Sequence, residues 1–223
     1  MPEVMEKVSY ARQLDIFNPE DYKNVHITVI GAGSVGSFVV LALAKMGIQS
    51  IEVWDDDTVE VHNIPNQFYP LASVGAYKVE ALASFVEVMT GVSIYTHKVR
   101  FTGSVLLPGI RSIIISAVDS LDVRRDLWKS IKTKEKPELY IDARMGGELM
   151  RIFAVRNSRD FVYYEDSLKG EAVALPCTAR SIVFNVLPIG GIVAALVKKH
   201  LKKELVHKEV IFDMRNFIFM ATK

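Results

Sequence analysis

The chain has 223 residues, of which 27 are Lys or Arg and 26 are Asp or Glu, so its formal charge is +1. Half of the residues are hydrophobic, which excludes a disordered chain, because disorder requires low hydrophobicity and high net charge. The single cysteine excludes a disulfide framework and a conventional zinc site, so we expect no zinc and a reducing, cytoplasmic setting. A charge of +1 provides no overall field to hold nucleic acid.

No targeting segment or membrane span is expected. Residues 1–20 are charged and lack an apolar stretch, which argues against a secretion signal. The longest uncharged run, 181–197, is shorter than the roughly 20 apolar residues of a membrane span and contains Pro188 and Gly190-Gly191. We therefore expect a buried loop-and-helix element in this run.

The spacing of apolar residues alternates between strand-like and helix-like from residue 25 to residue 143. Strands that alternate with helices indicate βαβ units, and hence a Rossmann-like, doubly wound and mainly parallel sheet with helices on both faces. The expected order is strand 25–30, helix 35–46, strand 50–54, irregular loop 56–72, helix 74–89, strand 92–99, strand 111–118, helix 121–131 and strand 139–143.

The pattern changes after residue 145 and predicts antiparallel strands that extend the sheet. We expect a strand at 148–155, a polar irregular segment at 157–177, a helix at 189–201 and a hairpin at 210–220. The chain, 1–223, is predicted to be one domain. Its parts would be an N-terminal helical arm (1–24), a nucleotide-binding half (25–145), and a C-terminal part (146–223) with the antiparallel extension, a crossover loop, a helix and the hairpin.

Gly31, Gly33 and Gly36 form a G-x-G-x-x-G pattern at a predicted strand-to-helix turn. The first glycine allows a tight turn, the second lets the backbone approach phosphates, and the third lets the helix pack closely on the strand. The amides at the helix N-terminus then face the phosphate charge. Asp55 stands 19 residues beyond Gly36, where a carboxylate can bind a ribose hydroxyl. The pattern predicts a nucleotide site but does not separate a dinucleotide from ATP.

The residues that follow Asp55 favour ATP over a dinucleotide. Lys78 can neutralise phosphate charge, and Asn63 can form hydrogen bonds with phosphate or ribose oxygens. Asp119 follows the apolar strand 111–118, on the ligand side of a parallel sheet. A carboxylate at that position can hold Mg²⁺, which prefers one or two carboxylates together with phosphate oxygens.

With these residues the chain resembles the ThiF/MoeB/HesA adenylyltransferases, the superfamily of the ubiquitin-activating enzymes. The resemblance runs from about Tyr10 to the C-terminal hairpin, and its matching pieces occur in the same order. The pieces are Tyr10-Ala11-Arg12-Gln13, the loop from Gly31 to Gly36, Asp55-x-Asp57-x-Val59, Asn63-x-x-x-Gln67, Val74-Gly75-x-x-Lys78-Val79-Glu80, Asp119-x-x-x-x-Arg124, and the Gly190-Gly191 helix before the hairpin.

The resemblance implies ATP and Mg²⁺ as cofactors. Asp55 would bind the ribose, the backbone around Gly33 would face the phosphates, Asn63 and Lys78 would contact the triphosphate, and Asp119 would be the magnesium ligand. Ser34, Asp57 and Asn66 belong to the same predicted nucleotide site.

The resemblance also implies a homodimer and shows two departures from the family pattern. Arg12 matches an arginine that reaches the γ-phosphate of the neighbouring subunit's nucleotide, so each site would be composite. Ser34 stands where the family usually has glycine and needs only an ordinary backbone conformation. Asn66 stands where the family usually has an arginine for the phosphates, which weakens the expected hold on the triphosphate.

The implied reaction is adenylation of the C-terminal carboxylate of a small ubiquitin-like or sulfur-carrier protein that ends in Gly-Gly. The nucleophile is already charged, so catalysis would come from positioning and from neutralising phosphate charge, with Arg12 and Lys78 as the catalytic cations. Pro176-Cys177-Thr178 resembles the segment at which ubiquitin-activating enzymes form a thioester. Cys177 is therefore a candidate thioester nucleophile, and the alternative is a small buried hydrophobic residue.

Two other functions stay open at this point. An NAD(P)- or FAD-binding oxidoreductase fits the glycine loop and Asp55, but it leaves Lys78 and Asp119 without a role. A non-catalytic nucleotide-binding relative fits the loss of the arginine at Asn66. It would bind ATP without releasing pyrophosphate.

Overall fold

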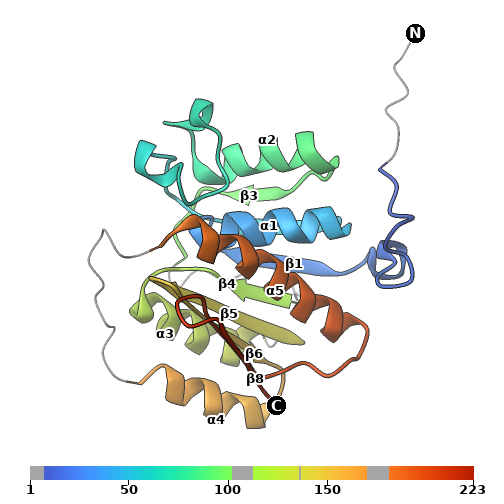
Figure 1. The fold of residues 1–223 in the computed structure, drawn as a ribbon, viewed down its shortest axis with the longest axis vertical. Helices are drawn as coiled ribbons and strands as arrows, with labels where there is room; N and C mark the ends of the chain where they lie inside the picture. The colour runs from blue at the N-terminus through green and yellow to red at the C-terminus, as the bar shows by residue number, and fades with distance from the viewer. Residues whose placement is uncertain (1–7, 102–112, 136, 170–180) are drawn as a thin grey trace.

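The structure is a computed structural model that describes residues 8–101, 113–135, 137–169 and 181–223. Within them, eight strands form one sheet in the order β3-β2-β1-β4-β5-β6-β7-β8 (Figure 1). The first five strands in this order are parallel and the last three are antiparallel, so the predicted fold class is confirmed. The strands are β1 (His26–Ile30), β2 (Ser50–Trp54), β3 (Tyr95–His97), β4 (Ile113–Ser116), β5 (Leu139–Gly146), β6 (Leu149–Val155), β7 (Glu209–Asp213) and β8 (Ile218–Thr222).

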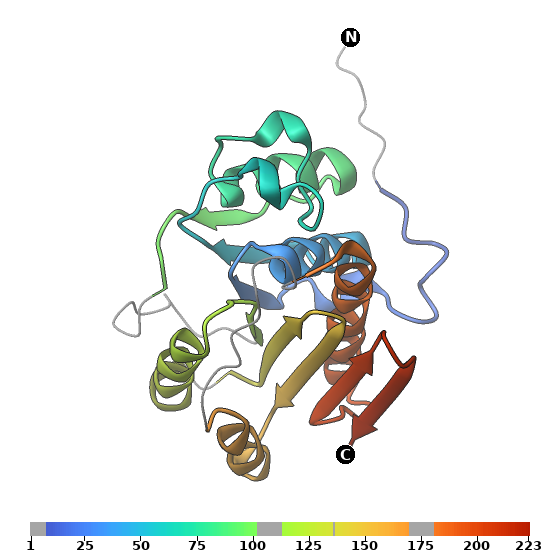
Figure 2. The ribbon, with the colours of Figure 1, turned by 60° about the vertical axis from the view of Figure 1, so that its left-hand side comes forward.

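Helices cover both faces of the sheet (Figure 2). Buried side chains of α1, α2 and α5 form one core with the sheet, and those of α3 and α4 form a second core on the other face. The strand β4 is buried on both faces, because Ile113 and Ile115 belong to the first core while Ile114 belongs to the second. Its sequence is therefore continuously apolar. The helices are α1 (Ser34–Met46), α2 (Lys78–Thr90), α3 (Leu121–Ser130), α4 (Ser158–Ser167) and α5 (Val183–Leu201).

Several predicted elements differ from the structure in extent. The strand expected at 92–99 is limited to Tyr95–His97, and the helix expected from residue 74 begins at Lys78, after a short 3-10 turn, η3 (Leu71–Ser73). Another 3-10 turn, η2 (Val61–Asn63), lies in the loop expected to be irregular. In the N-terminal arm, the described part contains only the 3-10 turn η1 (Pro19–Tyr22).

The segment expected to be irregular at 157–177 contains a helix, α4, so this prediction was wrong for its first part. Asn157 caps the helix by accepting hydrogen bonds from the N–H groups of Arg159 (3.0 Å) and Asp160 (3.3 Å). Phe161, Tyr164 and Leu168 then pack on the second core at helical spacing. The polar residues between them obscured this pattern.

The prediction of a loop before residue 189 was also wrong. The helix α5 begins six residues earlier, at Val183, and continues through Pro188. By length and composition alone α5 could cross a membrane. However, Ile189 and Val193 are fully buried in the first core, as in the core helix of a globular protein.

A buried polar network joins the second helical layer to the sheet. Asp142 on β5 is fully buried and accepts hydrogen bonds from Arg124 of α3, from Nε of Arg144 (2.7 Å) and from the hydroxyl of Tyr164 of α4 (2.8 Å). Arg144 also donates to the carbonyl (3.1 Å) and the hydroxyl (3.0 Å) of Ser167 at the end of α4. Burial lowers the pKa of Arg124 to about 10, so this arginine still carries its charge at neutral pH.

Substituting Asp142 should therefore destabilise the fold much more than substituting a surface carboxylate. Asp142→Ala leaves two arginines without their shared buried partner, a loss that typically costs about 3–5 kcal/mol. Asp122→Ala is the matched control, because Asp122 pairs with Arg125 on the surface of α3, where such pairs contribute below about 1 kcal/mol. Urea denaturation followed by circular dichroism measures both free energies of unfolding. Equal losses would contradict a structural role for the network.

Candidate functional site

The predicted site residues gather where the parallel strands end. The glycine loop follows β1, Asp55 follows β2, and Asp119 follows β4. Ligands of open α/β sheets bind at this edge, beyond the carboxyl ends of the strands. The topology alone therefore brings together residues that are 88 positions apart in the sequence, from Gly31 to Asp119.

The glycine loop is tightly folded on its inner side and open at its middle glycine. Gly31 has a φ of +98° and donates its N–H to the carbonyl of Trp54 (2.8 Å). A Cβ at Gly36 would lie 1.8 Å from the carbonyl oxygen of Gly31, whereas a Cβ at Gly33 would meet nothing within 4 Å. Gly33 caps α1 without a side-chain hydrogen bond, so the first amides of the helix remain available for an anion. Ser34 is the first helical residue and needs no unusual conformation.

Asp55 connects the glycine loop to the segment after β2. One carboxylate oxygen accepts the N–H of Ala32 (2.7 Å), and the other accepts the N–H of Asp57 (2.8 Å). Burial raises the pKa of Asp55, and these two hydrogen bonds oppose the rise. Each oxygen can accept a further hydrogen bond, so the carboxylate can still bind ribose hydroxyls.

Lys78 and Asn63 already have partners within the chain. The Lys78 ammonium lies 2.6 Å from a carboxylate oxygen of Asp57, and its side chain is only 9% exposed. Asn63 is buried, and its side-chain oxygen accepts the N–H of Glu60 (2.9 Å) at the start of η2. A triphosphate would therefore approach Lys78, whose charge is paired with that of Asp57. It would also approach Asn63, whose side chain holds the loop at η2.

Asn66 lies half-buried and connects the loop to the beginning of α5. Its side-chain nitrogen lies 2.5 Å from the hydroxyl of Ser181, which is 115 positions away in the sequence. A phosphate-binding arginine would have to project away from this contact. The structure thus gives Asn66 a structural contact with a distant segment of the chain.

Asp119 is exposed, and its backbone is fixed by Arg124. Arg124 lies on the first turns of α3 and donates to the carbonyl of Val118, directly before Asp119. This contact is a physical reason for the Asp119-x-x-x-x-Arg124 spacing, and sequence reasoning did not assign it. An exposed carboxylate at the ligand edge suits Mg²⁺, which takes its remaining ligands from phosphate and water. The ligand atoms of Asp55, Asp56 and Asp57 lie within 4.8 Å of one another, but Asp119 is not in that group.

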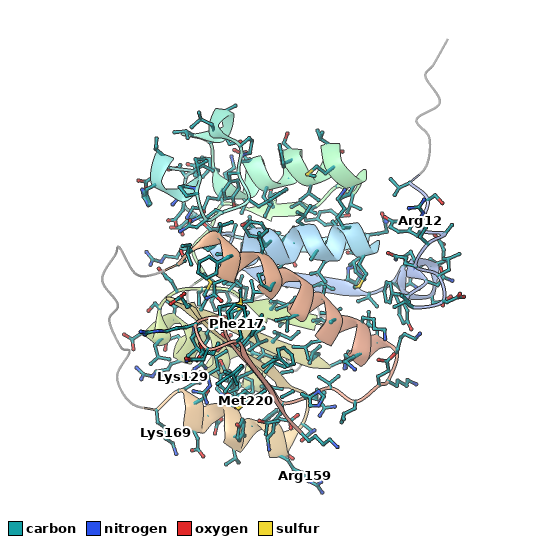
Figure 3. All side chains as sticks on the ribbon, viewed as in Figure 1. Arg12, Lys129, Arg159, Lys169, Phe217 and Met220 are labelled. Carbon is teal, nitrogen blue, oxygen red and sulfur yellow. The ribbon has the colours of Figure 1, made fainter. Side chains whose placement is uncertain are left out.

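Arg12 lies far from the glycine loop of its own chain (Figure 3). Its neighbour Gln13 donates to the carbonyl of Met46 (2.8 Å), at the end of α1. The glycine loop precedes the start of α1, which has 13 residues and is therefore about 20 Å long. Arg12 is thus not brought together with the other predicted site residues in one chain. Cys177 lies outside the described residues.

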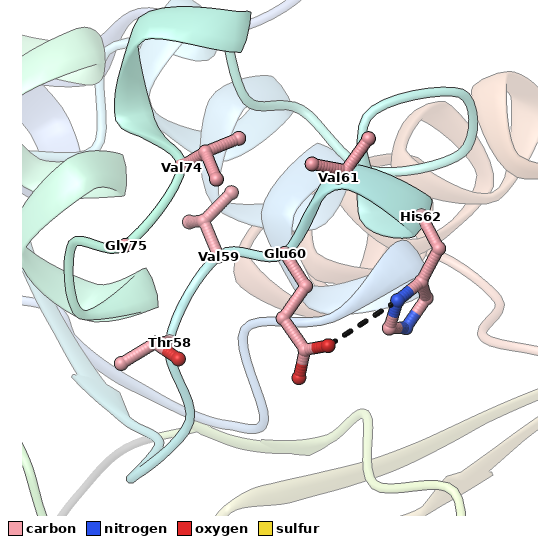
Figure 4. A pocket seen from close by; sticks show the side chains of 7 residues that line it. All are labelled: Thr58, Val59, Glu60, Val61, His62, Val74 and Gly75. Carbon is pink, nitrogen blue, oxygen red and sulfur yellow. Dashed lines mark ion pairs between the residues drawn. The ribbon is translucent and has the colours of Figure 1, made fainter.

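A groove of about 590 Å³ lies on the loop that connects β2 and α2 (Figure 4). Val59, Val61 and Val74 line it, and Glu60 pairs with His62 at 3.4 Å beside them. None of the glycine-loop residues lines this groove, so it is separate from the predicted phosphate site.

The fold is of the Rossmann type, with the glycine loop and Asp55 at the edge where the parallel strands end. The chain matches the model of the ThiF family over residues 10–221, and it belongs to this family. The family predicted from the seven sequence pieces is therefore confirmed. The alternative function of an NAD(P)- or FAD-binding oxidoreductase finds no support in this match.

Curated relatives carry the names of adenylyltransferases and activating enzymes, which agrees with the predicted class of enzyme. The chain is 26% identical to the molybdopterin-synthase adenylyltransferase of Salmonella typhimurium, over 98% of this chain and 92% of that protein. It is 38% identical to the NEDD8-activating enzyme E1 catalytic subunit of Caenorhabditis elegans, over 48% of this chain and 26% of that protein. It is 33% identical to the adenylyltransferase and sulfurtransferase MOCS3 of Aedes aegypti, over 52% of this chain and 27% of that protein. The last two alignments thus span about a quarter of each relative.

Solved structures share the fold. A structure of E. coli MccB with MccA has a TM-score of 0.74 and 16% identity, and the match covers 92% of this chain and 66% of that chain. A structure of PaaA has a TM-score of 0.71 and 19% identity, with 92% and 65% covered. At this level of identity the likeness confirms the architecture.

The two glycines of the loop should respond differently to alanine. Gly36→Ala should destabilise the protein, by about 1–3 kcal/mol, because the new Cβ collides with the backbone of Gly31. Gly33→Ala should leave the free energy of unfolding nearly unchanged, because its Cβ enters open space. It should weaken ATP binding at least tenfold, because the new Cβ stands where the backbone approaches the phosphates. Urea denaturation and ATP titration calorimetry measure the two effects. Undiminished ATP affinity in folded Gly33→Ala would exclude the loop as the phosphate site.

Proposed function

We propose that this protein is an ATP-dependent adenylyltransferase that activates the C-terminal carboxylate of a small ubiquitin-like or sulfur-carrier protein. The observation that carries the proposal is the open N-terminus of α1 at Gly33, with Asp55 and Asp119 following β2 and β4, the strands on either side of β1. These residues supply anion-binding amides, a ribose acceptor and a metal ligand. The names of the matched relatives support the same reaction class.

The reaction forms one bond and breaks one. A carboxylate oxygen of the carrier attacks the α-phosphorus of ATP, and the bond from that phosphorus to the bridging oxygen of pyrophosphate breaks. The products are an acyl-adenylate and pyrophosphate. No side chain has to remove a proton, because the nucleophile is already ionised. The chain therefore contributes positioning, and Asp119 would hold the Mg²⁺ that neutralises phosphate charge.

A homodimer with composite sites is part of the proposal. Arg12 lies at the far end of α1 from its own glycine loop, which supports a role at the site of another subunit, and the alternative is an ordinary surface charge. Apolar side chains are exposed both beside Arg12, at Leu14 and Ile16, and on the β2–α2 loop, at Val61 and Leu71. Such exposed apolar residues are typical of surfaces that are covered by another chain.

A thioester step on Cys177 is a further part of the proposal. It would follow adenylation, with the thiolate attacking the acyl carbon and AMP leaving. We also propose that the protein acts in the cytoplasm, without direct contact with nucleic acid or membrane.

One observation favours a second function, that of a non-catalytic nucleotide-binding relative. Asn66 replaces a phosphate-binding arginine and contacts Ser181, while Lys78 is paired with Asp57. Such a protein would bind ATP but would not catalyse pyrophosphate exchange with any carrier.

Pyrophosphate exchange tests the proposal directly. The substrates to test are small ubiquitin-like and sulfur-carrier proteins with C-terminal Gly-Gly, and exchange of labelled pyrophosphate into ATP should require one of them. Asp119→Ala should lower the exchange rate about 100-fold or more, because it removes the metal ligand. Asp122→Ala, a nearby surface carboxylate, should stay within twofold of the wild type.

The same assay separates the alternatives. Cys177→Ser should keep exchange but lose any thiol-sensitive adduct with the carrier. ATP binding without exchange would favour the non-catalytic relative. Absence of both ATP binding and exchange with every carrier would refute the adenylyltransferase.

Mixing two inactive variants tests whether Arg12 acts across the dimer. Arg12→Ala and Asp119→Ala should each be inactive alone, because each damages both sites of its homodimer. After subunit exchange, about half of the dimers are mixed and each has one intact site, so exchange activity should recover to about a quarter of the wild-type value. Mixtures that stay inactive although mass spectrometry detects mixed dimers would show that Arg12 does not act in trans.

A further inference from the structure

A second cavity lies away from the proposed nucleotide site. It has a volume of about 250 Å³ and is enclosed by the end of α3, the starts of β5 and α4, and the end of β6. Tyr140, the second residue of β5, forms part of its wall. The cavity is therefore near the edge where the parallel strands begin, whereas the glycine loop and Asp119 follow their ends.

Aromatic rings form much of the wall. The ring of Trp128 lies 5.4 Å from that of Tyr140 and 5.1 Å from that of Phe161, measured between ring centres. The polar atoms of two of these rings are already engaged, since Trp128 donates to Glu165 (3.0 Å) and the Tyr140 hydroxyl lies 3.2 Å from that of Tyr164. These rings therefore present mainly their faces and edges to the cavity. Such surfaces favour a planar aromatic ligand.

The charged residues that line the cavity are both cations. Lys132 and Arg156 line it, and no carboxylate does so among the residues that the structure describes. Lys132 is neutralised by Glu165, 2.6 Å away, and this contact holds the pKa of Glu165 below its ordinary value. Lys132 is therefore a weak candidate for a ligand contact.

Arg156 is less completely satisfied. Its Nε is buried and makes no hydrogen bond within the described chain. The carboxylate of Asp160 forms an ion pair with that nitrogen at 3.6 Å, which is beyond hydrogen-bond distance, and accepts the backbone N–H of Arg156 (3.0 Å). The Arg156 side chain is 30% exposed and lines the cavity, so its guanidinium can donate charge-assisted hydrogen bonds to an anionic ligand there.

The volume fits a small molecule. An apolar protein cavity of roughly 150 Å³ holds one benzene molecule. A cavity of about 250 Å³ therefore accommodates one ring together with a short acidic side chain. The neighbouring turn η4 (Ile131–Glu135) continues α3 as a π-helix, a geometry that often occurs at functional sites.

We propose that this cavity binds a small planar aromatic acid, with its ring against Trp128, Tyr140 and Phe161 and its carboxylate on the guanidinium of Arg156. The binding is noncovalent and independent of the adenylation proposed above. It requires no metal and no nucleotide.

Titration of the full chain with cinnamate tests this site, with cinnamamide as the neutral control of the same shape. The chain has two tryptophans, and the indole N–H signal of Trp128 in ¹H–¹⁵N spectra should shift saturably while that of Trp54 should not. Cinnamamide should bind at least tenfold more weakly, because it lacks the charge that Arg156 recognises. This comparison uses the unmodified protein and does not depend on the folding of a variant.

Variants then locate the charge that is recognised. Arg156→Met should weaken cinnamate binding at least tenfold. Arg159→Met should leave binding within twofold, because Arg159, in the first turn of α4, is exposed and does not line the cavity (Figure 3). The proposal is overturned by the absence of saturable binding at 10 mM cinnamate, by equal affinity for cinnamamide, or by unchanged affinity in a folded Arg156→Met variant.

Discussion

The buried carboxylate of Asp142 is the interaction on which most of the second helical layer depends. It accepts hydrogen bonds from two arginines and a tyrosine, and these residues belong to β5, α3 and α4. Because Arg124 also donates to the carbonyl of Val118, the same network fixes the end of β4 and so the backbone at Asp119. Two arginines around one buried carboxylate leave a net positive charge. The carbonyls of Ala143 and Ser167 and the hydroxyl of Ser167 accept hydrogen bonds from the arginines and partly offset this charge. The position of the proposed metal ligand thus depends on a charge network in the core.

The parts of the fold that local rules determine could be predicted from the sequence. The run Val25–Ile30, the glycine loop and the buried helix after it have the hydrophobic pattern and turn chemistry of a βαβ unit. The connection from β1 to α1 allows few alternatives, since Gly36 must approach Gly31 more closely than any side chain would permit. Asp55 was also predictable, because the end of the second strand lies beside the loop in every fold of this kind.

Contacts between distant segments were not predictable in the same way. The contact between Asn66 and Ser181 spans 115 positions and depends on the packing of α5 on α1. The role of Arg124 depends on the path of β5, which brings Asp142 beneath α3. The start of α5 was misjudged because Pro188 usually breaks a helix, yet here it lies within the first turns of a helix that tertiary packing stabilises. For α4, local signals were present in its Asn157 cap and apolar spacing but were outweighed by its polar composition.

The balance of charge at the site bears on how asparagine could replace the family's arginine at position 66. In one chain the phosphates would meet Lys78, whose charge is shared with Asp57, and Asn66, which has none, while Arg12 lies at the other end of α1. The local positive potential must then come from the amides at the start of α1 and from Mg²⁺ at Asp119. A triphosphate carries more negative charge than these groups neutralise. A cation from outside the chain, such as Arg12 of the proposed second subunit, would supply positive charge that Asn66 does not, and this links the proposed dimer to the identity of residue 66.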